Sequence, residues 1–448
     1  MPVRSPGTVP VIAIVGGGFA GAAVAQRLER RLRRGEAEIV LLGRDNYTLF
    51  TPMLPEVTSG ELEVRHVVTP IRAQLTRTTF VLAEVEAIDV EKRTLDYRYV
   101  LTGVTASLTY DHLVLALGSA TSTFGLPGVA DNVWALKTLD DADSLRNHLV
   151  WLLELADTIA DANFRRKLLS IVVVGGGFTG VETAGEIFEL FRSVLHFYRR
   201  LRLDELRMVL VEGGPVLLPG LPPKMGEYAR RVLERRGIEV LTGDAVTGAD
   251  RDGLALKSGR RIESATVIWS AGVAPSPTVA NTVLPKTKRG AVVTGRDMRV
   301  AEFPAVWALG DCASIPDGTG GNFPMTAQHA IREGPHLADN LVRALRGEPT
   351  RPFSYRSLGM MAALGGRKAV AQLPGNRVIT GFVAWFLWRS YYLLRLPGID
   401  RRLRVAFDWT LDLLFPRDIA ELRVDSETAR ADEGFEMTSP REEPKAPA

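Results

Sequence analysis

A chain of 448 residues with 46% hydrophobic content is long enough to bury at least two cores, so we expect two or three globular domains. Its single cysteine, Cys312, excludes a disulfide framework, a cysteine-rich zinc site and a redox-active cysteine pair, and we expect no metal site. The net charge of +3 gives no reason to expect a nucleic-acid partner. Since no apolar run reaches about 18 residues, we expect no membrane-spanning helix.

The first element in the chain is an apolar run at residues 11–15 that leads into Gly16-Gly-Gly-Phe-Ala-Gly21. This pattern predicts a buried strand, a tight turn and a helix, as in a dinucleotide-binding fold. In such a unit the first glycine permits the turn, the second lets the backbone approach a pyrophosphate, and the third allows close packing of helix on strand. One copy is weak support, because glycine-rich turns also serve packing alone.

A second copy follows at residues 171–180, where an apolar strand leads into Gly175-Gly-Gly-Phe-Thr-Gly180. Two such units predict two bound dinucleotides. The strand at residues 208–211 then ends at Glu212. A carboxylate there favours a free ribose 2′-hydroxyl and repels a 2′-phosphate, so we expect NADH rather than NADPH. The alternative is a solvated glutamate in a turn.

Three further apolar runs end where an open α/β sheet places its ligand crevice. Residues 113–117 stop at Gly118, residues 267–271 stop at Gly272, and residues 306–310 are followed by Asp311. The Asp311 carboxylate is suited to accept hydrogen bonds from sugar-like hydroxyls, or to cap a helix N-terminus. Both interpretations stay open at this stage.

These elements predict an α/β protein with two Rossmann-like dinucleotide-binding domains and a C-terminal module. We expect the first domain at residues 9–145 and 286–350, interrupted by the second at residues 146–285. Residues 351–424 form a distinct module, because twelve basic residues there face only five acidic ones. Residues 425–448 are acidic and rich in Pro, Ser and Glu, which predicts a disordered tail.

The C-terminal module is expected to contain amphipathic helices. Aromatic residues crowd residues 382–393, and a helix over residues 401–415 follows Pro397-Gly398. That helix has a polar stripe of Arg401, Arg404, Asp408 and Asp412, with Val405, Phe407, Trp409, Leu411 and Leu414 largely away from it. Such helices are typical of a membrane interface, where Arg389, Arg395, Arg401, Arg402 and Arg404 would attract anionic lipid. The alternative is packing on the core or on a second subunit.

Together these motifs resemble the type II NADH:quinone oxidoreductases, which are single-subunit members of the two-dinucleotide-binding-domain flavoprotein superfamily. The resemblance covers about residues 10–424. It rests on the two glycine turns and on the segments Arg44–Pro52, Gly175–Glu186, Leu309–Ala313, Thr326–Ala330 and Gly366–Ala371.

The resemblance implies non-covalent FAD in the first domain, NADH as co-substrate in the second, and a quinone acceptor. It also implies a homodimer attached peripherally to the cytoplasmic side of the cell membrane, without proton pumping. The residues implied for FAD are Gly16, Gly17, Gly18, Phe19, Ala20, Gly21, Arg44, Thr51, Val85, Asp311, Ala327 and Gln328. Those implied for NADH are Gly175, Gly177, Gly180, Glu212 and Gly272.

Two catalytic residues are implied by the same resemblance. Glu182 corresponds to a glutamate near the nicotinamide, and Gln328 to a glutamine at the quinone end. The structural alternatives are a glutamate favoured by the dipole of the first helical turn and a buried hydrogen-bonding amide.

One departure concerns the second strand of the first domain, which ends at Gly43 where the family usually has an acidic residue that binds the adenosine ribose. Asp45 or a water molecule would have to replace that bond. Disulfide reductases and sulfide:quinone oxidoreductases need at least two cysteines, so Cys312 alone excludes them. Two alternatives stay open: a soluble reductase of a protein such as ferredoxin, and a non-catalytic flavin-bound scaffold.

Overall fold

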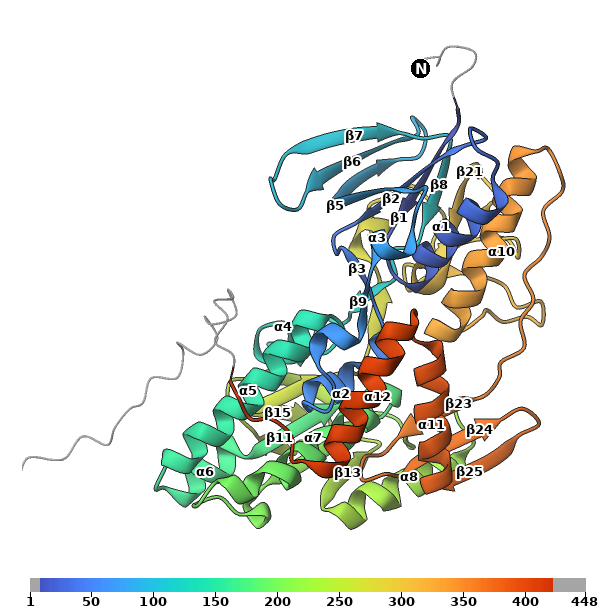
Figure 1. Ribbon diagram of the computed structural model, residues 1–448. Coiled ribbons are helices and arrows are strands. Elements are labelled where there is room, and N and C mark those ends of the chain that lie inside the picture. Colours follow the sequence, from blue (N-terminus) through green and yellow to red (C-terminus); the bar gives the residue numbers. More distant parts are fainter. Residues whose placement is uncertain (1–8, 422–448) are drawn as a thin grey trace, which may run out of the picture.

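The computed structural model describes residues 9–421, which form two lobes with a smaller C-terminal module against them (Figure 1). The upper lobe in Figure 1 is built on an eight-stranded sheet and the lower lobe on a five-stranded sheet. Each predicted glycine turn follows an inner strand of its sheet, Val11–Val15 (β1) and Ser170–Val174 (β11). The α/β fold with two Rossmann-like units is therefore confirmed. The predicted tail at residues 425–448 lies outside the described residues.

In the upper lobe β1 pairs in parallel with β2 on one side and with β8 on the other, so the carboxyl ends of these strands meet at one edge. Helices α1 (Phe19–Arg31) and α10 (Ala327–Leu345) pack together beside this sheet (Figure 1). Gly334 makes the close approach possible, because a Cβ there would lie 2.6 Å from the Cβ of Ala23. The strands, in spatial order, are β20 (Arg299–Val300), β21 (Phe303–Ala308), β8 (His112–Leu115), β1, β2 (Glu38–Gly43), β5 (Thr79–Asp89), β6 (Thr94–Tyr99) and β7 (Thr105–Thr109).

The five-stranded sheet of the lower lobe is parallel throughout. Its β11 leads through the second glycine turn into α7 (Phe178–Val194). The strands, in spatial order, are β10 (Trp134–Ala135), β17 (Thr266–Trp269), β11, β12 (Arg207–Glu212) and β13 (Ile238–Thr242). A small antiparallel sheet beside them contains β14 (Val246–Asp250), β15 (Gly253–Leu256) and β16 (Arg261–Glu263).

The chain passes from the upper to the lower lobe after β9 (Ser119–Thr121) and returns to the upper lobe at β18 (Val273–Pro275). These strands pair with each other in antiparallel fashion, so the outgoing and returning crossings are tied together. The predicted division at residues 145 and 146 falls inside α5 (Leu139–Thr158), and β10 already belongs to the sheet of the lower lobe.

The remaining elements are short or lie at the edges of the lobes. In the upper lobe and at the junction they are β3 (Tyr47–Leu49), a 3-10 turn (Thr51–Met53), α2 (Leu54–Thr58), a 3-10 turn (Val64–His66), β4 (Val68–Pro70), α3 (Ile71–Gln74), α9 (Pro277–Ala280), β19 (Val292–Val293), a 3-10 turn (Gly310–Cys312) and β22 (Ala313–Ser314). In the lower lobe they are α4 (Val129–Asn132), α6 (Ala162–Leu168), 3-10 turns at Leu195–Phe197 and Leu203–Glu205, and α8 (Pro223–Arg236).

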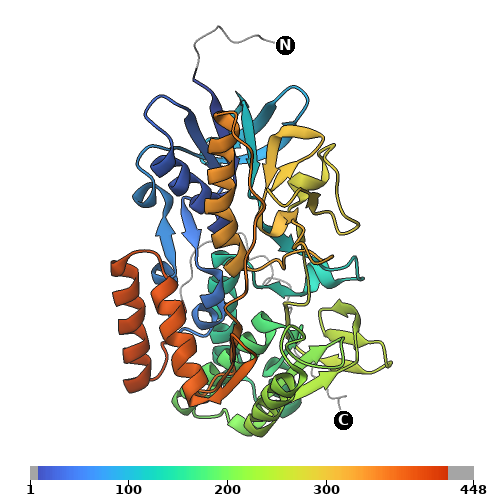
Figure 2. The ribbon, with the colours of Figure 1, turned by 90° about the vertical axis from the view of Figure 1, so that its right-hand side faces the viewer.

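The C-terminal module begins after a strap, residues 346–359, which runs back from α10 without helix or strand (Figure 1). It consists of an antiparallel sheet and two helices that lie side by side on the outside of the molecule (Figure 2). Its elements are β23 (Met360–Ala363), β24 (Ala369–Leu373), β25 (Arg377–Gly381), α11 (Phe382–Arg395) and α12 (Ile399–Leu414). Within residues 9–421, no helix is long and apolar enough to cross a bilayer.

The amphipathic character of α12 is confirmed, but its faces differ from the prediction. Asp408 and Asp412 of the predicted polar stripe turn inward, where His66 Nδ1 lies 2.5 Å from Asp408 and Arg417 Nε lies 3.1 Å from Asp412. The predicted apolar set divides between two faces: Val405 and Trp409 are buried, whereas Phe407, Leu411 and Leu414 are exposed. Periodicity alone could not separate these faces, because contacts with His66 and Arg417 hold the two acidic residues on the inner side of the helix.

Candidate active site

The two glycine turns have the same steric arrangement. A Cβ on Gly16, whose φ is +111°, would lie 2.2 Å from the carbonyl oxygen of Ala116, and a Cβ on Gly21 would lie 1.9 Å from that of Gly16. Around Gly18 a Cβ would meet nothing within 4 Å, so the backbone before α1 is open. This is the cradle that a pyrophosphate group requires at a helix N-terminus. The turn therefore fits the dinucleotide part of FAD.

In the lower lobe, a Cβ on Gly175 (φ +113°) would lie 2.8 Å from the backbone of Ala271, and one on Gly180 would lie 1.8 Å from the oxygen of Gly175. The backbone at Gly177 is open in the same way as at Gly18. The second turn therefore fits a second dinucleotide.

The carboxylate of Glu212 lies beside the second turn, at the end of β12 as predicted. Its Oε2 accepts a hydrogen bond from the backbone N–H of Gly176 at 2.5 Å, and its Oε1 accepts one from that of Gly214 at 2.6 Å. Carboxylate oxygens have further lone pairs, so these bonds leave acceptor capacity for a ribose hydroxyl. Glu212 is thus fixed in place next to the pyrophosphate cradle.

The corresponding position in the upper lobe, Gly43, has no side chain to accept such a bond. A Cβ there would lie 3.4 Å from the backbone nitrogen of Gly17, so the absence of an acidic residue is not forced by severe crowding. Asp45 lies nearby with its side chain 52% exposed and 3.7 Å from Arg44 Nε. Whether Asp45 substitutes for the missing acid stays a prediction.

Asp311 belongs to a small polar network at the junction of the lobes. Ser119 Oγ donates to Asp311 Oδ2 at 2.7 Å, and Lys137 Nζ donates to the same Ser119 hydroxyl at 2.8 Å. The N-cap of the short turn that contains Asp311 is Leu309, so the helix-cap interpretation of Asp311 is wrong. This network fixes the position of the Asp311 carboxylate at the carboxyl end of β21, and its role toward a sugar hydroxyl stays a prediction.

The other residues predicted to contact the cofactors differ in how deeply they are buried. Thr51 begins a 3-10 turn, and Ala327 is the first residue of α10. Val85 on β5 is buried in the core of the upper lobe. Gly272 lies against an aromatic ring, because a Cβ there would be 2.3 Å from Phe124 Cζ. The roles of these positions stay predictions.

Gln328 connects α10 with the strap. Its Nε2 donates to the carbonyl oxygen of Gly359 at 3.1 Å, while its Oε1 accepts from the backbone N–H of Leu358 at 3.1 Å and from the Tyr355 hydroxyl. The Arg332 guanidinium lies over the Tyr355 ring at 4.4 Å. Gln328 is therefore a hydrogen-bonding amide, held where the strap approaches the C-terminal module.

Glu182 faces the C-terminal module from α7 and is 7% exposed. Its Oε1 accepts hydrogen bonds from Trp388 Nε1 and from the backbone N–H of Ala363, both at 3.0 Å. Burial raises the pKa of this carboxyl to about 8, against these two bonds. The first-turn interpretation is wrong, because α7 begins at Phe178 and has no acidic residue in its first turn. Burial therefore favours the protonated form of Glu182 in the folded protein.

Sequence reasoning missed a buried ionic cluster next to Glu182, namely Glu61, Glu186, Arg389, Asp412 and Arg417. Arg417 Nη2 binds Glu61 at 3.0 Å and Glu186 at 2.8 Å. The detectable signal was the spacing of Glu182, Glu186 and Glu189 on an otherwise apolar helix, since these positions share one face with core residues.

The burial of Arg389 corrects the prediction that it attracts lipid. Its side chain is 12% exposed and pairs with Glu61, and its guanidinium lies over the rings of Trp385 and Trp409. Arg389 therefore points toward the lobes and away from the outer surface.

Comparisons with known proteins agree with this geometry. Residues 10–334 match the family described as pyridine nucleotide-disulphide oxidoreductase, and residues 358–418 match the NDH2 C-terminal domain. The chain is 31% identical to the type II NADH:quinone oxidoreductase Ndh of Mycobacterium tuberculosis, over 93% of this chain and 90% of the relative. The chain belongs to the type II NADH:quinone oxidoreductase family. The enzyme transfers a hydride from NADH to FAD and passes the electrons to a quinone without pumping protons.

Other type II relatives agree with this assignment. The mitochondrial internal alternative NAD(P)H-ubiquinone oxidoreductase A1 of Arabidopsis thaliana is 31% identical, over 93% of this chain and 86% of the relative. The fold is that of the NDH2 of Plasmodium falciparum solved with NADH, with a TM-score of 0.84 at 20% identity, covering 92% of this chain and 99% of that one. The quinone acceptor thus replaces the protein-acceptor and scaffold alternatives.

The buried carboxyl of Glu182 predicts a pH-dependent stability. Since its pKa rises from 4.5 in the unfolded chain to about 8, the folded protein keeps a proton that the unfolded chain releases as the pH rises above 4.5. The stabilising contribution is fully present below pH 4.5 and is lost as the pH rises through about 8. We expect Glu182→Gln to lose less free energy of unfolding between pH 5 and pH 8.5 than the unmodified enzyme.

Chemical denaturation of the FAD-loaded proteins at both pH values measures this difference. Glu263→Gln, at an exposed carboxyl on β16, is the control and should behave as the unmodified enzyme does. Identical pH dependence in all three proteins would show that Glu182 is ionised throughout.

Proposed function

We propose that the residues of the two lobes divide the reaction of this type II NADH:quinone oxidoreductase between two ends of one flavin site. The turn Gly16–Gly21 and Asp311 hold FAD, and the turn Gly175–Gly180 with Glu212 holds NADH. The open backbone at each central glycine and the fixed carboxylates support this assignment. Arg44, Thr51, Val85, Ala327 and Gly272 complete the proposed cofactor contacts.

We propose that Glu182 lies where the nicotinamide of NADH approaches the flavin, which we call the nicotinamide end of the site. Gln328 then lies where the quinone approaches, which we call the quinone end. Glu182 lies in the helix that begins at the second glycine turn, which supports a place beside the NADH site. Gln328 lies at the start of α10 in the other lobe and binds the strap that leads to the C-terminal module. Glu182 contacts the C-terminal module directly, and Gln328 binds the strap that leads into it, so a quinone that entered along this module would meet Gln328 at the strap.

Glu212 is expected to set the preference for NADH. Glu212→Gln keeps the length of the side chain and an oxygen for one of its two backbone bonds, but it removes the charge that repels a 2′-phosphate. Loss of one charge-assisted hydrogen bond is worth about 1.5–3 kcal/mol, so we expect the ratio of kcat/KM for NADH over NADPH to fall about tenfold or more.

Steady-state kinetics with both nucleotides and a short-chain quinone measure this ratio. Glu227→Gln, on an exposed part of α8, should leave it unchanged. Equal efficiency of the unmodified enzyme with NADPH and NADH would contradict the role of Glu212.

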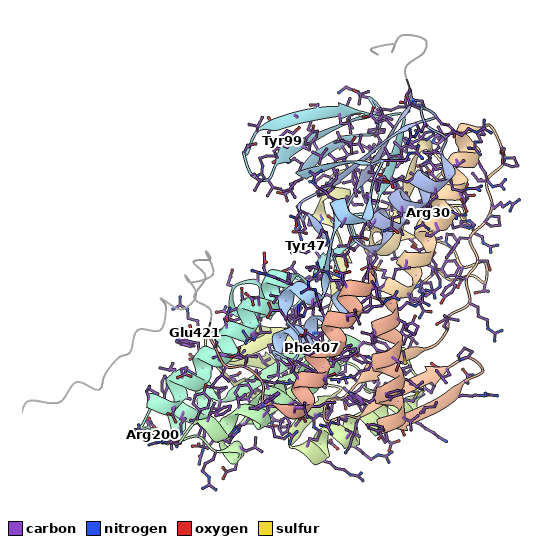
Figure 3. The ribbon with its side chains drawn as sticks, viewed as in Figure 1. Arg30, Tyr47, Tyr99, Arg200, Phe407 and Glu421 are labelled. Carbon is purple, nitrogen blue, oxygen red and sulfur yellow. The ribbon has the colours of Figure 1, made fainter. Side chains whose placement is uncertain are left out.

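Membrane attachment is proposed for the outer apolar face of α11 and α12. Its side chains are more than a third exposed although all are large and apolar, and Figure 3 marks one of them, Phe407, on α12. A patch of this kind marks an interaction surface. The face consists of Phe382, Val383, Phe386, Leu394, Ile399, Leu403, Phe407, Leu411, Leu413, Leu414 and Phe415.

Positive charge borders this face at Arg395 and Arg404, which are exposed, whereas Arg401 and Arg402 are partly buried. Each well-placed cation adds about 1 kcal/mol of attraction to anionic lipid. We place the enzyme on the cytoplasmic side of the cell membrane, where NADH is made. A homodimer is proposed on the same helices, with part of the apolar face of each copy covered and the rest left for the bilayer.

The apolar face predicts liposome binding that depends on a few side chains. Phe386→Glu combined with Phe407→Glu places two charges where residues 59% and 63% exposed would enter the bilayer, so co-sedimentation should be lost while NADH oxidation by a soluble dye continues. High salt should weaken binding of the unmodified enzyme only in part.

Leu101→Glu is the matched control, because Leu101 is 84% exposed but lies on the upper lobe. No liposome binding by the unmodified enzyme at either salt would refute peripheral attachment through these helices. Light scattering of the same proteins without liposomes measures their molar mass and so tests the homodimer.

A further inference from the structure

Glu56 is a carboxylic acid enclosed between α2 and the C-terminal helices, with 4% of its surface exposed. Its Oε1 accepts a hydrogen bond from Trp409 Nε1 at 3.1 Å. Its Oε2 is also buried and has no hydrogen-bond partner among residues 9–421. An ionised carboxylate with one oxygen in this state would be strongly destabilising, whereas a protonated acid carries no charge.

The guanidinium groups near Glu56 form their ion pairs with other carboxylates, and Arg389 Nε, like Glu56 Oε2, is buried without a hydrogen-bond partner among residues 9–421. Arg389 of α11 pairs with Glu61, and Arg417 binds Glu61, Glu186 and Asp412. Neither arginine bonds to Glu56. The region between α2, α7 and the C-terminal helices therefore contains more carboxyl groups than its two guanidinium groups, Arg389 and Arg417, can neutralise.

Other titratable groups of the packed elements are Glu182 and Glu186 of α7, Tyr392 of α11, Asp412 of α12 and Arg146 of α5. Burial raises the pKa of Glu56 to about 8; the charge of Arg389 opposes the rise, and Glu186 and Glu182 add to it. Burial thus favours the protonated form of both Glu56 and Glu182, and the two carboxyls bind the neighbouring indoles of Trp409 and Trp388, whose ring centres are 6.5 Å apart.

The reaction requires such a proton. NADH supplies two electrons and one proton, but a quinone takes up two electrons and two protons, so NADH + H⁺ + quinone gives NAD⁺ + quinol. One proton in each turnover must therefore come from the protein or from solvent. Reduction beneath the C-terminal helices would shield the quinone from water, which makes an internal acid useful.

We propose that Glu56 holds this second proton and supplies it to the quinone oxygen during reduction. The O–H bond of Glu56 breaks, a new O–H bond forms on the reduced quinone, and Glu56 is left as a carboxylate. Solvent returns the proton on the side of Asp412, the most exposed acid of the cluster at 21%. This inference rests on the acceptor end proposed above, and it adds a proton donor to it.

Glu56→Gln tests the proposal because it removes the proton but keeps an oxygen to accept from Trp409. The rate of NADH oxidation is measured against pH with a short-chain quinone and with ferricyanide, which takes electrons without protons. In the unmodified enzyme the quinone rate should fall as the pH rises through about 8, because the acid form is lost. In Glu56→Gln the quinone rate at pH 7 should be about tenfold lower and lack this fall, while the ferricyanide rate is unchanged.

Trp409→Phe separates a proton role from a structural one, because it breaks the same hydrogen bond without removing the proton. The proposal predicts that Trp409→Phe keeps the fall near pH 8, and that Glu56→Asp, which retains an acid, keeps more quinone activity than Glu56→Gln. Infrared spectra should also show a protonated-carboxyl band that Glu56→Gln lacks.

An unchanged quinone pH profile in Glu56→Gln overturns the proposal, as does an equal loss with ferricyanide or the same defect in Trp409→Phe. If Glu56→Gln does not retain FAD, the pH profile of Glu56→Asp decides: a fall near pH 8 supports the proposal and its absence overturns it. A quinone-specific defect at Gln328 without one at Glu56 would leave the acceptor end in place and remove only the proton donor.

Discussion

The contact on which the rest of the structure depends is the docking of the C-terminal module on buried carboxyl groups of α7. Glu182 accepts from Trp388, and Glu186 accepts from Arg417, which binds Glu61 as well. Removing one partner of a buried ion pair costs about 3–5 kcal/mol, because the other charge is left uncompensated. These bonds therefore fix α11 and α12 in one position, and a truncation would expose charges as well as remove a membrane surface.

This docking brings the chemistry of both lobes to one place. Helix α7 begins at the second glycine turn and reaches the module at Glu182, while the first turn of α10 reaches the strap through Gln328. Asp408 and Asp412 of α12 point inward, where they bind His66 and Arg417, and the outer side of the helix is therefore largely apolar. The contacts that close the site thus also create the surface proposed for the bilayer.

The sequence predicted the parts of the fold that follow local rules. Both glycine turns, the strand that ends at Glu212 and the fold class are confirmed, because a tight turn after a buried strand leaves a distinct local pattern. The inward position of Asp408 and the burial of Arg389 could not be predicted, since their partners His66 and Glu61 lie more than 300 residues away in the chain. The burial of Glu56 has the same cause, because Trp409 and Arg389, which enclose it, are far from it in sequence.

The central claim is that NADH and quinone react at two separate ends of one flavin site, with the quinone end formed where Gln328 binds the strap. Stopped-flow absorbance of Gln328→Ala tests it most directly. The account predicts that NADH reduces the flavin at the unmodified rate and that a soluble dye reoxidises it normally. Reoxidation by quinone should slow about tenfold, equivalent to about 1.4 kcal/mol in the barrier. Unchanged reoxidation by quinone, or an equal loss in both half-reactions, would contradict the account.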